Sequence, residues 1–172
     1  MAARTTTNVL FLCTGNSARS VMAEALLNVL GAGRFRAFSA GSFPSGTVQP
    51  IAVELAQAFG YSAPLRSKRW DEFTQPDSPP IDIVITVCDN AAGELCPIWP
   101  GQPVIAHWGV PDPVAVDGDE QQRRRVFQSA WTMLRGRIER LLTLPLEKLD
   151  RATLQQALRA IGTGNQHEEL SK

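Results

Sequence analysis

The chain has 172 residues, which is enough for one domain with a sizeable buried core. Its 17 lysines and arginines balance its 17 aspartates and glutamates, and this formal net charge of zero argues against nonspecific nucleic-acid binding and electrostatic attachment to a membrane. The apolar run near the N-terminus is too short for a signal-peptide core or a membrane span, so we expect a soluble, cytoplasmic protein without nucleic-acid or membrane partners.

The first elements follow from an apolar segment and a helical repeat. Residues 1–7 are expected to form a flexible leader, and residues 8–12 are apolar and typical of a strand. The stretch CTGNSARS occupies positions 13–20. Apolar residues then recur at helical spacing at Met22, Ala25, Leu26 and Val29. The sequence therefore predicts a strand, a tight loop and a helix.

The rest of the chain continues this alternation. We expect strands at 35–40, 81–87 and 104–106. We expect helical segments from Pro50 to Gly60, around 70–72, at 120–142, and from Asp150 to about Gly162, followed by a frayed end. This order predicts a single three-layer α/β domain, a parallel sheet flanked by helices, over residues 8–145, with a C-terminal helix and tail over 146–172.

The loop at positions 13–20 carries the clearest chemical signal. A loop at a helix start directs unpaired backbone N–H groups at one spot, where the helix dipole also favours negative charge. The Arg19 guanidinium can hold two oxygens of a tetrahedral oxyanion, and its charge is expected to lower the pKa of Cys13 and keep that residue as a thiolate nucleophile. Asn16 tolerates a left-handed backbone, and Ser20 can donate to the thiolate. The predicted oxyanion cradle comprises Thr14, Gly15, Asn16, Ser17, Ala18, Arg19 and Ser20.

Two further cysteines follow the strand predicted at 81–87. Ligands of parallel α/β folds bind beyond the carboxyl ends of the strands, so Cys13 and Cys88 should face one crevice. Cys96 comes after seven intervening residues, a gap too wide for close-spaced zinc pairs, and metal binding is not expected. The odd number of cysteines indicates thiol chemistry rather than a disulfide scaffold. The alternative is that Cys88 and Cys96 are buried structural residues.

Asp112 lies between two prolines in the segment HWGVPDP. An aspartate beside proline is ordinary turn chemistry when it stands alone. Beside a bound oxyanion, however, a carboxylic acid can protonate a departing oxygen, which is general acid catalysis. Both interpretations of Asp112 remain open at this point.

Several motifs in this order make the chain similar to a known family. CTGNSARSVMAEALL, FSAG, VITVCDNAAGELCP and HWGVPDP, spread between about Val9 and Leu142, resemble the low-molecular-weight protein tyrosine phosphatase superfamily. More narrowly, they resemble its arsenate reductase branch. The resemblance implies a four-stranded parallel sheet with helices on both sides. It also implies reduction of arsenate to arsenite with thiols, as part of arsenic detoxification.

The resemblance also implies a role for each candidate residue. Cys13 would attack arsenate, which Arg19 and the loop amides would hold, and Asp112 would protonate the leaving hydroxide. Cys88 would then attack the sulfur of the Cys13 adduct, releasing arsenite and leaving a Cys13–Cys88 disulfide. Cys96 would attack Cys88 and pass the disulfide outward to thioredoxin.

External components are likewise taken from the resemblance. This chain has seven residues between the last two cysteines where thioredoxin-linked members usually have six, so glutathione with glutaredoxin is an alternative reductant. No tightly bound cofactor is implied. Some thioredoxin-coupled members bind potassium near the loop, and the matching residues here are Asn16, Glu24 and Ser39.

Two other functions use the same residues. A phosphatase acting on phosphotyrosine or similar monoesters needs only the cradle, the nucleophile and the acid. Val114 and Ala115, however, stand where tyrosine phosphatases usually place aromatics that stack on phosphotyrosine, which disfavours that substrate. A third possibility is a noncatalytic oxyanion or redox sensor in which Cys88 and Cys96 switch a partner-binding surface.

Overall fold

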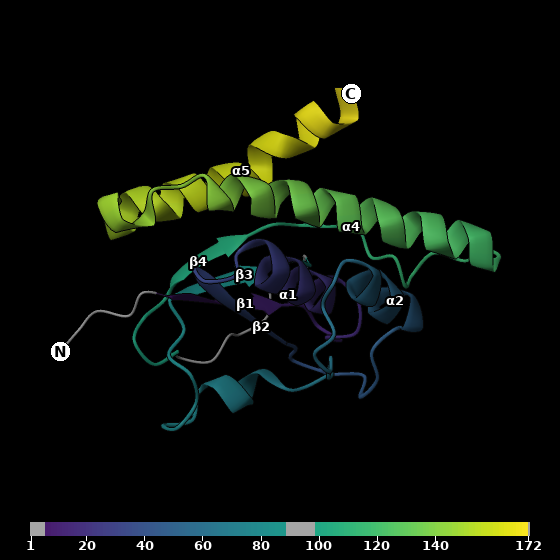
Figure 1. Ribbon diagram of the computed structural model, residues 1–172, viewed down its shortest axis with the longest axis horizontal. Helices are drawn as coiled ribbons and strands as arrows, with labels where there is room; N and C mark the ends of the chain where they lie inside the picture. Colours follow the sequence, from purple (N-terminus) through teal and green to yellow (C-terminus); the bar gives the residue numbers. More distant parts are fainter. Residues whose placement is uncertain (1–5, 89–98, 172) are drawn as a thin grey trace.

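The computed structural model describes residues 6–88 and 99–171, with side chains as far as residue 163. In this part of the chain, a four-stranded sheet has the order β2-β1-β3-β4, formed by β1 (Thr7–Leu12), β2 (Phe35–Ala40), β3 (Ile83–Thr86) and β4 (Val104–His107). All neighbouring strands are parallel. The helical elements are α1 (Arg19–Leu30), α2 (Pro50–Ala58), α4 (Glu120–Leu142), α5 (Arg151–Ser171) and the 3-10 turns η1 (Trp70–Phe73) and η2 (Leu146–Lys148) (Figure 1). None of these described helices has the length and apolarity needed to cross a membrane.

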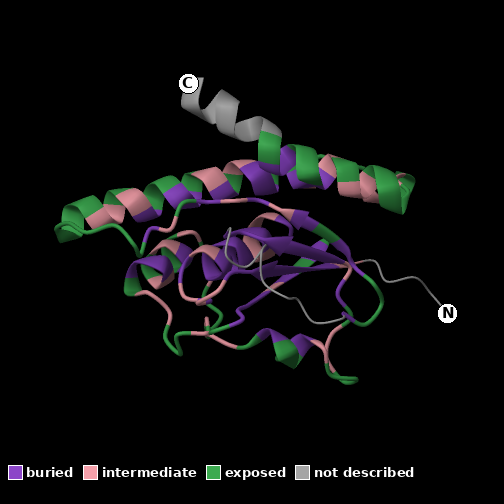
Figure 2. Cartoon of the chain, turned by 180° about the vertical axis from the view of Figure 1, so that it is seen from behind, coloured by how far each residue is buried: buried purple, intermediate pink, exposed green. Residues whose placement is uncertain are grey.

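The sheet separates two apolar layers. Val9 and Phe11 of β1 face a large core with α1, α2, α4 and α5, whereas Leu10 and Leu12 face a smaller core with η1 and Trp99. This alternation is the two-residue period of a strand that is buried on both faces. Figure 2 shows the buried strands beneath α4 and α5, which carry exposed residues on their outer sides. The predicted α/β fold with a four-stranded parallel sheet is confirmed.

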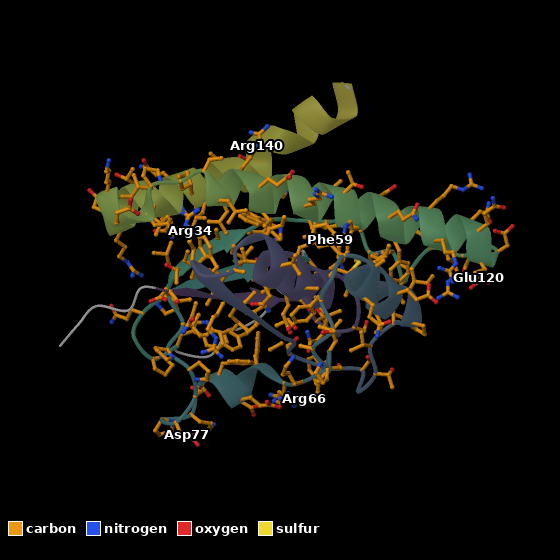
Figure 3. The ribbon with its side chains drawn as sticks, in the orientation of Figure 1. Arg34, Phe59, Arg66, Asp77, Glu120 and Arg140 are labelled. Atoms are coloured by element: carbon orange, nitrogen blue, oxygen red, sulfur yellow. The ribbon has the colours of Figure 1, made fainter. Side chains whose placement is uncertain are left out.

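Helix boundaries follow local signals in the sequence. α2 begins at Pro50, whose fixed φ suits the first helical turn. α4 has the predicted bounds and starts with a capping box, in which Asp119 Oδ1 accepts the Gln122 N–H (2.8 Å) and Gln122 Oε1 accepts the Asp119 N–H (3.0 Å). Phe59, labelled in Figure 3, follows α2 and meets Trp131 of α4 edge-on with ring centroids 5.4 Å apart.

Several predicted boundaries differ from the structure. Thr7 belongs to β1 rather than to the leader, β3 covers Ile83–Thr86 rather than 81–87, and α5 continues beyond Gly162 to Ser171. Glycine commonly ends helices, but here it meets a packing need, since a Cβ at position 162 would overlap the carbonyl oxygen of His107. The missing side chain therefore lets α5 lie directly against the end of β4.

Candidate active site

Residues 13–18 connect β1 to α1 as a tight loop at the carboxyl end of the sheet. Asn16 adopts a left-handed backbone, with φ of 46°. In a trans peptide the C=O of one residue and the N–H of the next point in opposite directions. Where a loop carbonyl accepts a hydrogen bond from outside the loop, the next N–H therefore points toward the inside. Such inward donors are what an oxyanion cradle requires. The outside bonds run to Thr14 O from Phe43 N–H (3.0 Å), to Gly15 O from Ser45 N–H (2.9 Å) and to Ser17 O from Gln49 N–H (2.9 Å).

Part of the segment between α2 and η1 braces this cradle. The Ser67 hydroxyl donates to Gly15 O (3.1 Å), and the Lys68 N–H donates to Asn16 Oδ1 (2.8 Å). The Gly41 N–H donates to Lys68 O (2.9 Å), and a Cβ on this glycine would overlap the carbonyl oxygens of Cys13 and Thr14. Only glycine lets these three segments meet so closely. The sequence analysis missed this brace, and the glycine of the FSAG motif was the signal that could have indicated it.

A chain of hydrogen bonds leads from the brace to the Cys13 sulfur. Asn16, which is fully buried, donates from Nδ2 to Ser20 Oγ (2.8 Å), and Ser20 Oγ lies 3.3 Å from Cys13 Sγ. The Ser20 hydroxyl can donate to this sulfur, and this hydrogen bond lowers the Cys13 pKa. This geometry stabilises a thiolate at Cys13.

Cys88, just beyond β3, lies at the inner side of the same loop. The Thr14 N–H donates to Cys88 Sγ (3.3 Å), and Thr14 Oγ1 lies 3.6 Å from that sulfur. Cys13 and Cys88 are both buried and both unbridged. The two cysteines therefore lie close together, as expected. The Cys88 sulfur accepts the hydrogen bond of Thr14, whose N–H is the first backbone donor of the predicted cradle. Cys96 lies outside the described residues.

The pKa of the Cys13 thiol is raised well above its usual range, first by the hydrogen bond with Cys88 and then by burial. The Ser20 hydrogen bond and the Arg19 charge lower this pKa without offsetting the rise. The predicted lowering of the Cys13 pKa is therefore wrong for this arrangement. The prediction rested on Arg19 and the loop, and it did not include a second sulfur beside the first.

Two substitutions should shift the Cys13 pKa in opposite directions. We expect Cys88→Ala to lower it, because the largest cause of the rise is removed, and Ser20→Ala to raise it further. The measurement is the pH dependence of iodoacetamide alkylation at Cys13, followed by peptide mass spectrometry. An unchanged alkylation profile in Cys88→Ala would show that the neighbouring sulfur does not control the nucleophile.

Arg19 and Asp112 lie side by side at the mouth of the loop. Arg19 begins α1, and its Nη1 donates to Val110 O (2.9 Å) in the loop that carries Asp112. Arg19 Nη2 lies 3.5 Å from Asp112 Oδ2, and Asp112 Oδ1 accepts the Val114 N–H (3.0 Å). The Asp112 side chain is 40% exposed and therefore open to solvent. The candidate acid and the candidate oxyanion ligand thus share one site.

The residues that match the potassium ligands do not form a cation site here. The Ser39 hydroxyl donates to Glu24 Oε1 (2.6 Å), while the Asn16 amide binds Ser20 and the Lys68 backbone. The Lys68 ammonium lies 3.9 Å from Glu24 Oε1 and donates to Ser39 Oγ (3.5 Å). A positive charge already stands beside Glu24 and Ser39, so potassium does not fit. Among the described residues, no group of three or more His, Cys, Asp or Glu side chains could hold a metal ion.

The chain is similar in sequence to a known family and to named relatives. The model of the low-molecular-weight phosphotyrosine protein phosphatase family matches residues 8–156. An arsenate reductase of Bacillus licheniformis is 34% identical over 133 residues, which cover 77% of this chain and 92% of the relative. A glutaredoxin arsenate reductase of Synechocystis is 31% identical over 134 residues, which cover 78% and 95%.

A solved structure agrees with these sequence matches. The structure described as an arsenate reductase in the phosphate binding state is 30% identical, with a TM-score of 0.62, and the match covers 79% of this chain and 96% of the other. The match to the family model spans the nucleophile loop, Cys88 and Asp112. The chain therefore belongs to the low-molecular-weight phosphotyrosine protein phosphatase family, in the branch whose members are named arsenate reductases.

Proposed function

We propose that this chain is an arsenate reductase that works through a covalent adduct on Cys13 and an intramolecular thiol-disulfide relay. The observation that carries the proposal is the contact of two buried thiols, Cys13 and Cys88, at the ends of adjacent parallel strands. A phosphatase uses one nucleophilic sulfur, whereas reduction of arsenate needs two electrons, which a pair of thiols can supply on forming a disulfide. The family relationship supports the same assignment.

The first step is nucleophilic attack on arsenate. The inward N–H groups of the loop and the Arg19 guanidinium would bind its oxygens. The Cys13 thiol, whose pKa is raised in the free protein, would pass its proton to an oxygen of the bound dianion as its sulfur forms a bond to arsenic. One arsenic–oxygen bond breaks, and the departing oxygen takes a proton from Asp112 and leaves as water. Arsenic remains in its +5 state in this adduct.

The second step transfers electrons. The Cys88 thiolate, to which the Thr14 N–H is already directed, would attack the Cys13 sulfur. The sulfur–sulfur bond forms while the sulfur–arsenic bond breaks, and the bonding pair stays on arsenic. Arsenic is thereby reduced from +5 to +3 and leaves as arsenite, while two thiols are oxidised to one disulfide.

The resulting disulfide would need a third thiol to reach an external reductant. Cys13 and Cys88 are only 3% and 2% exposed, so the active-site cysteine of a thioredoxin or glutaredoxin cannot contact them in this arrangement. Cys96 is the remaining cysteine of the chain and is the candidate carrier. The reductant would be thioredoxin or glutathione with glutaredoxin, and the name of the Synechocystis relative supports the second.

Replacement of Cys96 tests this carrier. We expect Cys96→Ser to lose thioredoxin-supported turnover while still releasing one arsenite per enzyme, because the Cys13–Cys88 step is intact. Arsenite release in a single turnover and NADPH consumption over many turnovers give the two readouts. Full steady-state activity of the variant with glutathione and glutaredoxin would instead assign the final step to an external thiol.

The activity itself is tested by comparing two substrates. We expect arsenate-dependent NADPH consumption with a thioredoxin or glutaredoxin system, and only slow hydrolysis of an aryl phosphate. Cys13→Ser should abolish both reactions, because each begins on that sulfur. Rapid phosphate-ester hydrolysis without arsenate reduction would replace the reductase assignment by a phosphatase.

A further inference from the structure

We infer that the Lys68 ammonium is the built-in counter-ion of buried Glu24 and thereby positions the oxyanion loop, so that anion binding by this chain does not depend on potassium. The inference rests on the proposed oxyanion site. Lys68 is a positioning residue in this role, since it contacts the loop and not the reacting atoms.

The Lys68 side chain is built into its position. The Glu24 and Lys68 side chains are only 11% and 10% exposed, and a carboxylate at such depth needs an opposite charge or hydrogen bonds to stay ionised. Burial raises the pKa of Glu24, whereas the Ser39 hydrogen bond and the Lys68 charge act in the opposite direction. The Lys68 ammonium also donates to Arg66 O (2.7 Å), and Arg66 is labelled in Figure 3.

The backbone of the same residue holds the cradle. The Lys68 N–H donates to Asn16 Oδ1 (2.8 Å), and the other end of that amide orients Ser20 toward the Cys13 sulfur. Anchoring of the ammonium beside Glu24 thus fixes the backbone that orients Asn16. Loss of the anchor would loosen a catalytic geometry in which small displacements have large effects.

Potassium should replace the ammonium only when the ammonium is removed. Three oxygens surround it: a Glu24 carboxylate oxygen, the Ser39 hydroxyl and the Arg66 carbonyl. These are hard oxygen donors of the kind that simple cations bind, and a potassium ion is close in size to an ammonium group. Lys68→Met keeps a long unbranched side chain but removes its charge, which would leave Glu24 available to a cation.

The test measures binding of inorganic phosphate by calorimetry in choline chloride and in potassium chloride. For the wild type and for the exposed control Lys148→Met, we expect equal affinity in both salts. For Lys68→Met, we expect affinity about tenfold or more weaker in choline chloride, with recovery in potassium chloride. The double variant Glu24→Gln/Lys68→Met has no buried charge to compensate and should not respond to potassium.

Three results would overturn the inference. The first is that potassium strengthens phosphate binding by the wild type. The second is that Lys68→Met binds phosphate in choline chloride as tightly as the wild type does. The third is that potassium fails to restore the phosphate affinity of Lys68→Met although this variant melts as cooperatively as the wild type. Phosphate binding separates this inference from the proposed function. Intact phosphate binding without arsenate turnover would contradict only the reductase assignment. A wild type that binds no phosphate would contradict both the reductase assignment and the role of Lys68.

Discussion

Cys88→Ser should reduce multiple-turnover arsenate reduction by about 10³-fold or more. The physical reason is that a serine hydroxyl cannot form the disulfide that accepts the oxidising equivalents of arsenate. Cys88 lies against the nucleophile, and its sulfur accepts the Thr14 N–H, so no other described thiol is placed to make this attack. The measurement is steady-state NADPH oxidation with saturating reductant, together with arsenite release.

Phosphate affinity provides the control for this variant. In Cys88→Ser the cradle keeps its hydrogen bonds to Ser67 and Lys68. We therefore expect the variant to bind phosphate with an affinity within a few-fold of that of the wild type. Mass spectrometry of the variant should find a Cys13 adduct or free Cys13, never a disulfide between the nucleophile and position 88. Steady-state turnover near the wild-type rate would eliminate Cys88 from the relay.

Asp112→Asn should lower kcat by about 10²–10⁴-fold, the usual contribution of a general acid. Asparagine keeps an oxygen that can accept the Val114 N–H, so the loop should retain its conformation. The amide cannot donate a proton to the departing oxygen. Loss of the negative charge next to Arg19 should leave anion affinity equal or slightly stronger, so the effect falls on kcat and not on KM.

Asp117→Asn is the matched control, because Asp117 is exposed in the same loop and carries the same charge. We expect its kcat and KM to equal those of the wild type. The comparison uses initial rates of arsenate reduction at saturating arsenate over a range of pH. A kcat for Asp112→Asn within threefold of that of the control would show that Asp112 stabilises the turn and does not act as the general acid.

The parts of the site that follow from strand and loop order were predictable from the sequence. The carboxyl ends of parallel strands share one edge, which was enough to bring Cys13 and Cys88 together. The left-handed Asn16 and the Ser20 contact followed from side-chain chemistry within a single loop. Each of these inferences needed only local structure and the general geometry of parallel sheets.

The features that escaped prediction depend on distances between distant segments. The raised pKa of Cys13 arises because the Cys88 sulfur touches it, and strand order alone does not give a sulfur-to-sulfur contact. Lys68 stands in a polar stretch with no periodicity, so nothing local indicated its contact with Glu24. Gly162 carries the ordinary signal of a helix end, but the closeness of β4 gives it a different role.

The most direct test of the relay is one turnover without any reductant. Wild-type protein, fully reduced and then mixed with excess arsenate, should release one arsenite per chain and lose two hydrogens in its mass, with a disulfide mapped among its cysteines. In a Cys96→Ser background that disulfide should join Cys13 to Cys88. Reduced thiols throughout, with no arsenite formed, would contradict the proposed mechanism.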